Sequence, residues 1–234
     1  MLTPSSNTIL EPLTSAMVSG VPGVSAHFSR FRVTEISLKD AALGQFDDAP
    51  ILEAAKLLAD ARVSVICWNG TSSGWLGFDA DVRLCDRIKA ATGIPACTSV
   101  LALNEILETT GAKNFGLVTP YLDEVQAKIL ENYSKSGFHC IAERHLNKSV
   151  NFSFSEVTPD QVGILVREVA GAKPEAISTF CTNMNAAVAV PKLEQELGIP
   201  IYDTVSTAVW KSLKLAGVDP RAVKGWGRLF QEVA

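Results

Sequence analysis

A cysteine stands at the end of a short apolar run in the second half of the chain. Residues 177–180 (Ile-Ser-Thr-Phe) read as a buried strand that runs into a loop at Cys181. In open α/β sheets, ligands bind at the carboxyl ends of strands, where loops present backbone N–H groups and short polar side chains. A thiol in that place, beside hydroxyl groups, can act as a proton carrier or as a nucleophile. We therefore expect the chemistry of this chain to depend on Cys181.

Two earlier loops supply hydroxyl groups that can face the cysteine. Gly70, Thr71 and Ser72 follow one apolar run, and Tyr121 follows another. With backbone N–H groups near Ser72 and Thr182, these side chains are donors suited to the oxygens of a carboxylate or an enediolate. Removing one fixed donor of this kind typically costs about 10²–10³ in rate.

These loops require strands that end on the same side of a sheet. Strand-like runs alternate along the chain with segments whose apolar residues recur at helical spacing. The predicted strands are residues 24–31, 63–67, 114–119, 138–143 and 176–180. The predicted helices are residues 48–60, 79–92, 100–109, 122–136, 158–170, 190–197 and 205–216. Such alternation is typical of an α/β fold, in which helices cover both faces of a parallel sheet.

The pattern begins again near the middle of the chain. Residues 2–5 (Leu-Thr-Pro-Ser) return as 118–121 (Val-Thr-Pro-Tyr), and residues 69–72 (Asn-Gly-Thr-Ser) as 180–183 (Phe-Cys-Thr-Asn). Residues 92–95 (Thr-Gly-Ile-Pro) return as 197–200 (Leu-Gly-Ile-Pro). All three offsets are about 110 residues, which indicates an internal duplication.

The duplication predicts two Rossmann-like lobes related by a pseudo-twofold axis, each with a parallel four-stranded sheet. We expect the first lobe to comprise residues 1–112 with the returning segment 205–234, and the second to comprise residues 113–204. The strand-end loops of both lobes would meet at a shared cleft. Gly70 and Cys181 would then occupy matching positions on its opposite walls.

Composition limits the partners of the protein. A formal net charge of −4 without a basic stripe gives no reason to expect nucleic acid. No apolar run reaches the roughly 18 residues of a membrane helix, and the first residues lack the features of a secretion signal. Five cysteines without a CxxC pair and three scattered histidines indicate neither a disulfide framework nor a metal cluster. We expect a reduced, cytoplasmic protein that acts on a small carboxylate and can form a homo-oligomer.

At these residues the chain resembles the aspartate/glutamate racemase superfamily, in particular its maleate cis–trans isomerases and arylmalonate decarboxylases. Residues 4–8 (Pro-Ser-Ser-Asn-Thr) with Glu11 are similar to the opening loop of the isomerases, and Asn151 resembles their second asparagine site. The resemblance covers nearly the whole chain. Two interpretations of Asn7 and Asn151 stay open: they bind a second carboxylate, or they only cap turns.

Other residues are more similar to the decarboxylases. These are the loop at residues 70–72, Tyr121, Cys181 and the tail at 225–230 (Gly-Trp-Gly-Arg-Leu-Phe). Racemases and maleate isomerases of this superfamily have a cysteine on each wall of the cleft, whereas this chain has Gly70 where the first would be. Cys67 lies three residues earlier in the strand, which turns its side chain away from the cleft. We therefore expect open space on the Gly70 wall, and a Gly70→Cys variant able to exchange protons there.

A single cysteine favours one reaction over the others. It can protonate a carbanion that forms by another route, such as the loss of CO₂ from a malonate. The hydroxyl groups would hold the enediolate, an apolar wall would favour the departure of CO₂, and Cys181 would protonate one face. The leading hypothesis is thus a cofactor-independent decarboxylase of a malonate-like diacid.

Two other classes remain open at this point. A maleate isomerase or an aspartate/glutamate-type racemase would use Cys181 together with water or with another base on the Gly70 wall. A non-catalytic binder of small carboxylates would have lost the first cysteine along with its activity.

Overall fold

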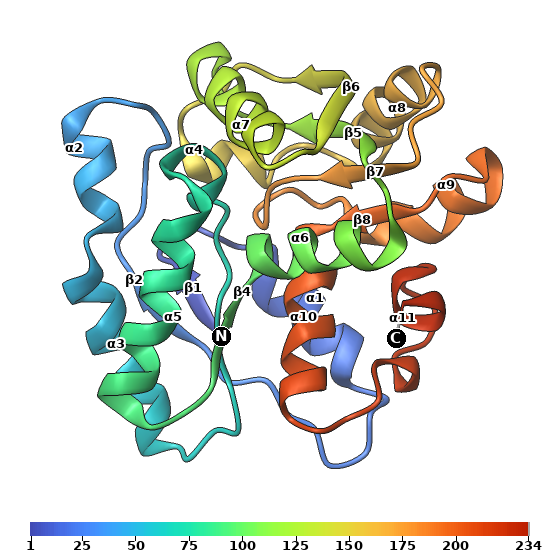
Figure 1. Ribbon diagram of the computed structural model, residues 1–234. Helices are drawn as coiled ribbons and strands as arrows, with labels where there is room; N and C mark the ends of the chain where they lie inside the picture. Colours follow the sequence, from blue (N-terminus) through green and yellow to red (C-terminus); the bar gives the residue numbers. More distant parts are fainter. Residues whose placement is uncertain (234) are drawn as a thin grey trace.

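The computed structural model describes residues 1–233, with every side chain in that range except that of residue 48. Two parallel four-stranded sheets form the two lobes, in the orders β2-β1-β3-β4 and β6-β5-β7-β8 (Figure 1). The orders are equivalent, because β1 to β4 occupy in the first sheet the places of β5 to β8 in the second. The predicted α/β fold with two duplicated lobes is confirmed.

Short strands and longer helices alternate along the chain. The strands are β1 (Leu2–Pro4), β2 (Ser29–Phe31), β3 (Ile66–Trp68), β4 (Ala96–Thr98), β5 (Asn114–Thr119), β6 (His139–His145), β7 (Ala176–Thr179) and β8 (Ile201–Asp203). The α-helices are α1 (Leu10–Val18), α2 (Asp40–Leu43), α3 (Asp48–Asp60), α4 (Ser73–Leu76), α5 (Phe78–Thr92), α6 (Ser99–Thr110), α7 (Asp123–Lys135), α8 (Pro159–Ala170), α9 (Val190–Leu197), α10 (Thr204–Leu215) and α11 (Leu229–Glu232). Within residues 1–233, no helix combines the length and the apolar character needed to cross a bilayer.

Several elements were absent from the sequence prediction. The strands β1, β4 and β8 and the helices α1, α2, α4 and α11 were not predicted, and the strand expected over residues 24–31 forms only as β2. A strand of three residues is too short for apolar and polar positions to alternate recognisably. Its pairing with neighbouring strands, such as the register of Cys67 with Cys97 between β3 and β4, defines it instead.

The predicted helix ends agree closely with the structure. Gly93 after α5 and Gly198 after α9 adopt φ values of +72° and +70°, the left-handed C-cap conformation that favours glycine. At the start of α8, the Thr158 hydroxyl accepts a hydrogen bond from the backbone N–H of Gln161, which completes a capping box.

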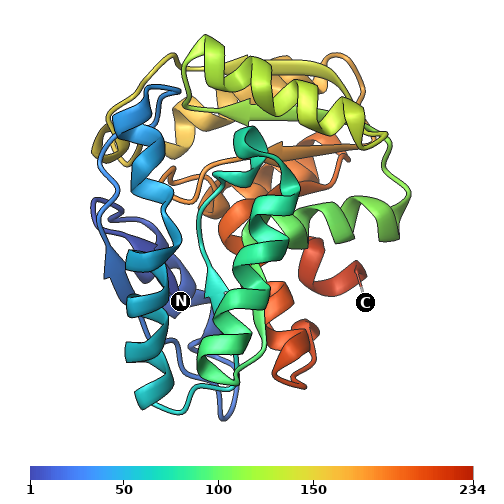
Figure 2. The same cartoon turned by 60° about the vertical axis from the view of Figure 1, so that its left-hand side comes forward.

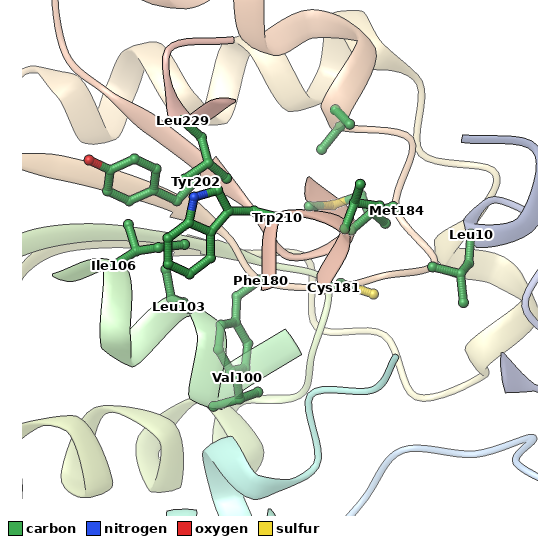
Figure 3. Close-up of a cluster of buried hydrophobic side chains, with 14 of the residues drawn as sticks. Leu10, Val100, Leu103, Ile106, Phe180, Cys181, Met184, Tyr202, Trp210 and Leu229 are labelled. Atoms are coloured by element: carbon green, nitrogen blue, oxygen red, sulfur yellow. The ribbon is translucent and has the colours of Figure 1, made fainter. Parts of the chain in front are cut away.

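The helices α6 and α10 follow equivalent strands and pack side by side between the sheets (Figures 1 and 2). Thr98 caps α6 and Asp203 caps α10, each from the last position of the preceding strand. Figure 3 shows Trp210 of α10 against Leu103 and Ile106 of α6 in the core beneath this pair. Because α10 contacts β3 and β4 as well as β8, the lobe boundaries at residues 112 and 205 stay a prediction.

The buried carboxyl of Asp203 has a perturbed acidity. One of its oxygens accepts hydrogen bonds from the N–H groups of Val205 and Ser206, and the other accepts one from the Thr179 hydroxyl at 2.8 Å. Burial nevertheless raises the pKa of Asp203 to about 7. The folded protein therefore holds a proton that an unfolded chain releases near pH 4.

This proton predicts a pH dependence of stability. Because the folded-state pKa lies above the unfolded one, the free energy of unfolding should fall as pH rises from about 4 to about 7, then level off. Asp203→Asn keeps an acceptor for the helix cap but cannot ionise, so it should remove this part of the slope in urea midpoints measured from pH 5 to pH 8. Asp86→Asn, at an exposed position of α5, is the matched control and should keep the wild-type slope. An unchanged slope in Asp203→Asn would contradict the assignment.

Candidate active site

A cavity of about 20 Å³ lies between the lobes, where the strand-end loops of the two sheets meet. This volume holds about one water molecule. Its lining comprises Pro4, Val33, Ile36, Phe46, Trp68, Gly70, Thr71, Trp75, Tyr121, Asn151, Cys181 and Thr182. Six of the eight candidate site residues are in this set; the other two, Ser72 and Asn7, are buried next to it but do not line it.

Cys181 reaches the cavity from the loop after β7. Only 2% of the residue is exposed, and Figure 3 shows its sulfur directed away from Trp210, while the preceding Phe180 points toward Val100. Burial raises the pKa of the thiol to about 12, although the Tyr121 hydroxyl and backbone N–H groups of the same loop lower it. At neutral pH, Cys181 is therefore a neutral thiol.

A pair of hydroxyl groups spans the cleft beside this thiol. The Thr71 and Tyr121 oxygens lie 2.5 Å apart and come from loops of different lobes. Burial and the neighbouring Cys181 raise the pKa of Tyr121 well above its ordinary value, so the phenol stays protonated. Trp75 and Phe154 pack edge-on against the Tyr121 ring, with centroid distances of 5.3 and 5.6 Å, and hold it in place.

A hydrogen bond joins the two strand-end loops directly. The Thr182 hydroxyl donates to the carbonyl of Asn69 at 3.0 Å, and it accepts a hydrogen bond from the Asn7 amide at 3.3 Å. The carbonyl oxygen of Asn7 accepts the N–H groups of Ile9 and Leu10 at the start of α1. The Asn7 side chain therefore caps the turn that leads into α1, and its amide positions Thr182.

Asn151 reaches the cavity from a short 3₁₀ helix, Asn151–Phe154. Its side-chain amide donates to the Ser6 hydroxyl at 2.7 Å, and its backbone carbonyl accepts a hydrogen bond from Asn183 at 2.6 Å. Asn183 also accepts the backbone N–H of Thr8. The sequence reading did not single out Asn183, although its place two residues after Cys181 in the repeated loop was a signal for it.

The segment at residues 33–46 covers the cavity. It extends from the first lobe to the second, where the N–H of Ile36 donates to the carbonyl of Ser149 and the N–H of Asn151 donates to Thr34. Val33, Ile36 and Phe46 from this segment line the cavity. Single apolar residues in an irregular segment have no periodicity, so the sequence could not indicate their role.

The expectation of open space on the Gly70 wall is wrong. A Cβ atom added to Gly70 would lie 2.0 Å from Cζ2 of Trp68, so the Trp68 indole fills this space. Trp68 is 1% exposed and packs on Phe31 with ring centroids 5.1 Å apart. Cys67 is fully buried against Cys97 and does not line the cavity, which agrees with its expected orientation away from the cleft.

A larger hollow of about 350 Å³ lies elsewhere on the first lobe. Residues 61–65, which precede β3, form part of its lining, so it lies at the opposite end of the sheet from the strand-end loops. None of the candidate site residues lines it. The smaller cavity is therefore the candidate active site, because the thiol and the hydroxyl pair meet there.

The fold and the site together define a two-lobed α/β protein that encloses a buried cysteine between equivalent strand-end loops. The family model described as arylmalonate decarboxylase matches residues 9–230, and the chain belongs to this family. The match extends over both lobes, which confirms the resemblance that the sequence indicated.

Relatives in this family carry two different names. The chain is 26% identical to an arylmalonate decarboxylase of Bordetella bronchiseptica over 185 residues, which are 78% of this chain and 77% of the relative. It is 28% identical to a maleate isomerase of Nocardia farcinica over 242 aligned positions, covering 99% and 94% of the two chains. The family relationship therefore leaves two reactions to be distinguished.

Solved structures share the fold at low sequence identity. The maleate isomerase Iso from Pseudomonas putida S16 superposes with a TM-score of 0.90 at 22% identity, covering 100% of this chain and 97% of that one. Unliganded arylmalonate decarboxylase superposes with a TM-score of 0.77 at 22% identity, covering 99% and 96%. Both kinds of enzyme thus have the two-lobed architecture described above.

The hydrogen bond between the loops predicts the effect of changing Thr182. Thr182→Val keeps the shape of the side chain but leaves the Asn69 carbonyl and the Asn7 amide without this partner, which should cost about 1–3 kcal/mol in the free energy of unfolding. Thr182→Ser retains the hydroxyl group and is the matched control. Equal urea midpoints for the two variants would show that the bond does not contribute to stability.

Proposed function

We propose that the protein is a cofactor-independent decarboxylase of a malonate-like dicarboxylic acid. The observation on which this depends is a single protonated thiol, Cys181, that faces the Thr71 and Tyr121 hydroxyl pair in a small and largely apolar cavity. The reaction needs a place for the retained carboxylate, an apolar place for the departing one, and one proton donor.

The acidity of Cys181 favours a proton donor over a nucleophile. A nucleophilic cysteine needs its thiolate, which enzymes stabilise with cations, helix N-termini or a histidine. Here burial raises the pKa of Cys181 to about 12. The thiol therefore keeps its proton until a strongly basic carbanion forms next to it.

The hydroxyl pair provides donors for the retained carboxylate. When CO₂ leaves, the electron pair of the broken C–C bond moves onto the α-carbon and is shared with this carboxylate as an enediolate. Thr71 and Tyr121 can each turn a hydroxyl toward its oxygens, and the indole N–H of Trp75 has no hydrogen-bond partner among residues 1–233. We assign these three groups to the stabilisation of the developing charge.

The rest of the lining suits the departing group. Val33, Ile36 and Phe46 present only carbon atoms, and a carboxylate pressed against them loses hydration that neutral CO₂ does not need. The proton of the Cys181 thiol then forms the new C–H bond, and the resulting thiolate takes a proton from water when the product leaves. No other reactant is needed for this balance.

A maleate isomerase is the alternative, because a relative with that name aligns with 99% of the chain. A structure of a Nocardia farcinica maleate cis–trans isomerase variant holds a covalently bound succinylcysteine intermediate. Covalent addition here would have to start from Cys181, since no other cysteine of residues 1–233 lines the cavity. The protonated state of this thiol at neutral pH favours the decarboxylase. A racemase and a non-catalytic carboxylate binder would each give a different product pattern in the assay that follows.

One assay distinguishes the reactions. Carboxyl-¹³C-labelled methylmalonate and phenylmalonate, together with maleate and aspartate, are incubated with the protein in D₂O and followed by NMR. We expect labelled CO₂ from a malonate, with one deuterium on the α-carbon of the product. Formation of fumarate would indicate an isomerase, α-deuteration of aspartate a racemase, and no change a binder.

The thiol is tested in the same assay. Cys181→Ala should lower kcat for the malonate at least about 10²-fold, because general acids typically contribute 10²–10⁴-fold. Cys85→Ala, which changes a cysteine outside the cavity, should retain wild-type turnover. Full activity in Cys181→Ala would exclude the thiol as the proton donor.

The donors are tested with one matched pair of tyrosine variants and with a variant of Trp75. Tyr121→Phe should reduce kcat/KM by about 10²–10³. Tyr133→Phe is the control, because Tyr133 is fully buried outside the cavity and its hydroxyl has no partner among the described residues. Trp75→Phe keeps an aromatic ring but lacks the N–H, and should also lower kcat/KM. If Tyr121→Phe and Tyr133→Phe behave alike, the hydroxyl pair does not stabilise the transition state.

A further inference from the structure

Trp68 and Gly70 form a matched pair on the wall opposite Cys181. A Cβ atom at Gly70 would lie 2.0 Å from Cζ2 and 2.4 Å from Cη2 of Trp68, closer than real side chains approach. Gly70 is not among the glycines with positive φ, so its backbone conformation is open to any residue. Glycine is therefore required here by the volume of the indole.

The sheet and the core hold this indole in place. Trp68 is the last residue of β3, which pairs with β1 on one side and with β4 on the other. Its ring packs on Phe31, and the residue is 1% exposed. Trp68 is thus part of a rigid wall, unlike Ile36 and Phe46, which reach the cavity from the irregular covering segment.

The equivalent position in the other lobe contains a small residue. In the repeated loops Gly70 corresponds to Cys181, so Trp68 corresponds to Thr179. The Thr179 side chain turns toward Asp203, to which its hydroxyl donates a hydrogen bond at 2.8 Å. One wall therefore combines a small residue with a thiol that reaches the cavity, and the other combines a large indole with a glycine.

We propose that Trp68 determines the substrate specificity of this site, limiting the α-carbon of the diacid to hydrogen or small alkyl substituents and closing the face opposite Cys181. This inference rests on the proposed decarboxylase function. The cavity holds about one water molecule, so a bound diacid needs more room than the enclosing side chains leave. An aryl group is much larger than this cavity, and the Trp68 indole leaves it no room beside Gly70.

The position of the indole is tested without any assay of activity. Gly70→Ala should lower the Tm by about 3–10 °C, as expected when a methyl group is forced into a filled core. Trp68→Phe lacks Cζ2 and Cη2 but keeps a ring on Phe31, and in this background Gly70→Ala should cost less than half as many degrees. Trp68→Leu is the second background, in case the phenylalanine ring takes up the same space.

A second glycine provides the matched control. A Cβ atom at Gly74 would lie 2.8 Å from the ring of Phe180 and is not crowded by Trp68. Gly74→Ala should therefore lower the Tm equally in the wild-type and Trp68→Phe backgrounds. If Gly70→Ala also costs the same in all three backgrounds, the indole does not fill this space and the proposal is overturned, whatever reaction the protein catalyses.

The specificity is tested with methylmalonate and phenylmalonate. The wild-type protein should prefer methylmalonate in kcat/KM by at least tenfold, and Trp68→Phe or Trp68→Leu should shift this preference toward phenylmalonate by at least tenfold. Trp210→Phe, which changes a buried tryptophan outside the cavity, should leave the ratio unchanged. Two results would overturn the inference while leaving the decarboxylase intact. One is a wild-type protein that turns over phenylmalonate as well as methylmalonate. The other is an unchanged ratio of the two kcat/KM values in both Trp68 variants. Loss of CO₂ from neither malonate would overturn the proposed function itself, and the proposed specificity with it.

Discussion

The hydrogen bond from the Thr182 hydroxyl to the Asn69 carbonyl is the interaction on which the candidate site depends. It links the loop that follows β3 to the loop that follows β7, and so links the two lobes at the point where they enclose the cavity. Duplicated sheets bring their carboxyl ends together only if loops of opposite lobes satisfy each other's polar groups, because unpaired backbone groups are costly when buried. The 2.5 Å contact of Thr71 with Tyr121 is a second link of the same kind. Both links place hydroxyl groups beside Cys181, so the pairing that closes the structure also defines its chemistry.

Burial stabilises the protonated forms of Cys181 and Tyr121 but destabilises a bound carboxylate, and the proposed reaction uses both effects. Removal of water raises the pKa of Cys181 to about 12 and that of Tyr121 well above its ordinary value, which keeps both groups protonated. The same lack of water destabilises a carboxylate that faces the apolar lining. A neutral thiol is a poor nucleophile but a competent acid toward a carbanion, and a neutral phenol can donate to a growing negative charge without a change of its own charge. The electrostatics of the site thus favour a step that begins with charge on the substrate and consumes one proton from the protein.

The sequence predicted the scaffold and the thiol because both leave local signals. The restart of motifs after about 110 residues indicated the two lobes, and Gly93 and Gly198 indicated helix ends through a backbone conformation that favours glycine. The position of Cys181 after an apolar run was enough to place it at a strand end. The covering segment and the wall at Gly70 were beyond such reasoning, since they depend on which way a side chain turns in three dimensions. The same letters Trp-Asn-Gly are compatible with an open wall and with a filled one, and contact with Phe31 decides between them.

The filled wall changes the interpretation of the missing cysteine. A glycine in place of a cysteine would leave a gap if nothing else differed, and gaps in a packed interior are costly. Here the indole of Trp68, two residues earlier in the chain, fills the space beside Gly70. Its counterpart in the second lobe is the much smaller Thr179. The two walls therefore differ at two positions: Trp68 is large where Thr179 is small, and Gly70 is small where Cys181 is larger. A cysteine placed at residue 70 alone clashes with the Trp68 indole. A change from glycine to cysteine at residue 70 is consequently a packing change before it is a chemical one, because the new Cβ atom meets the Trp68 indole.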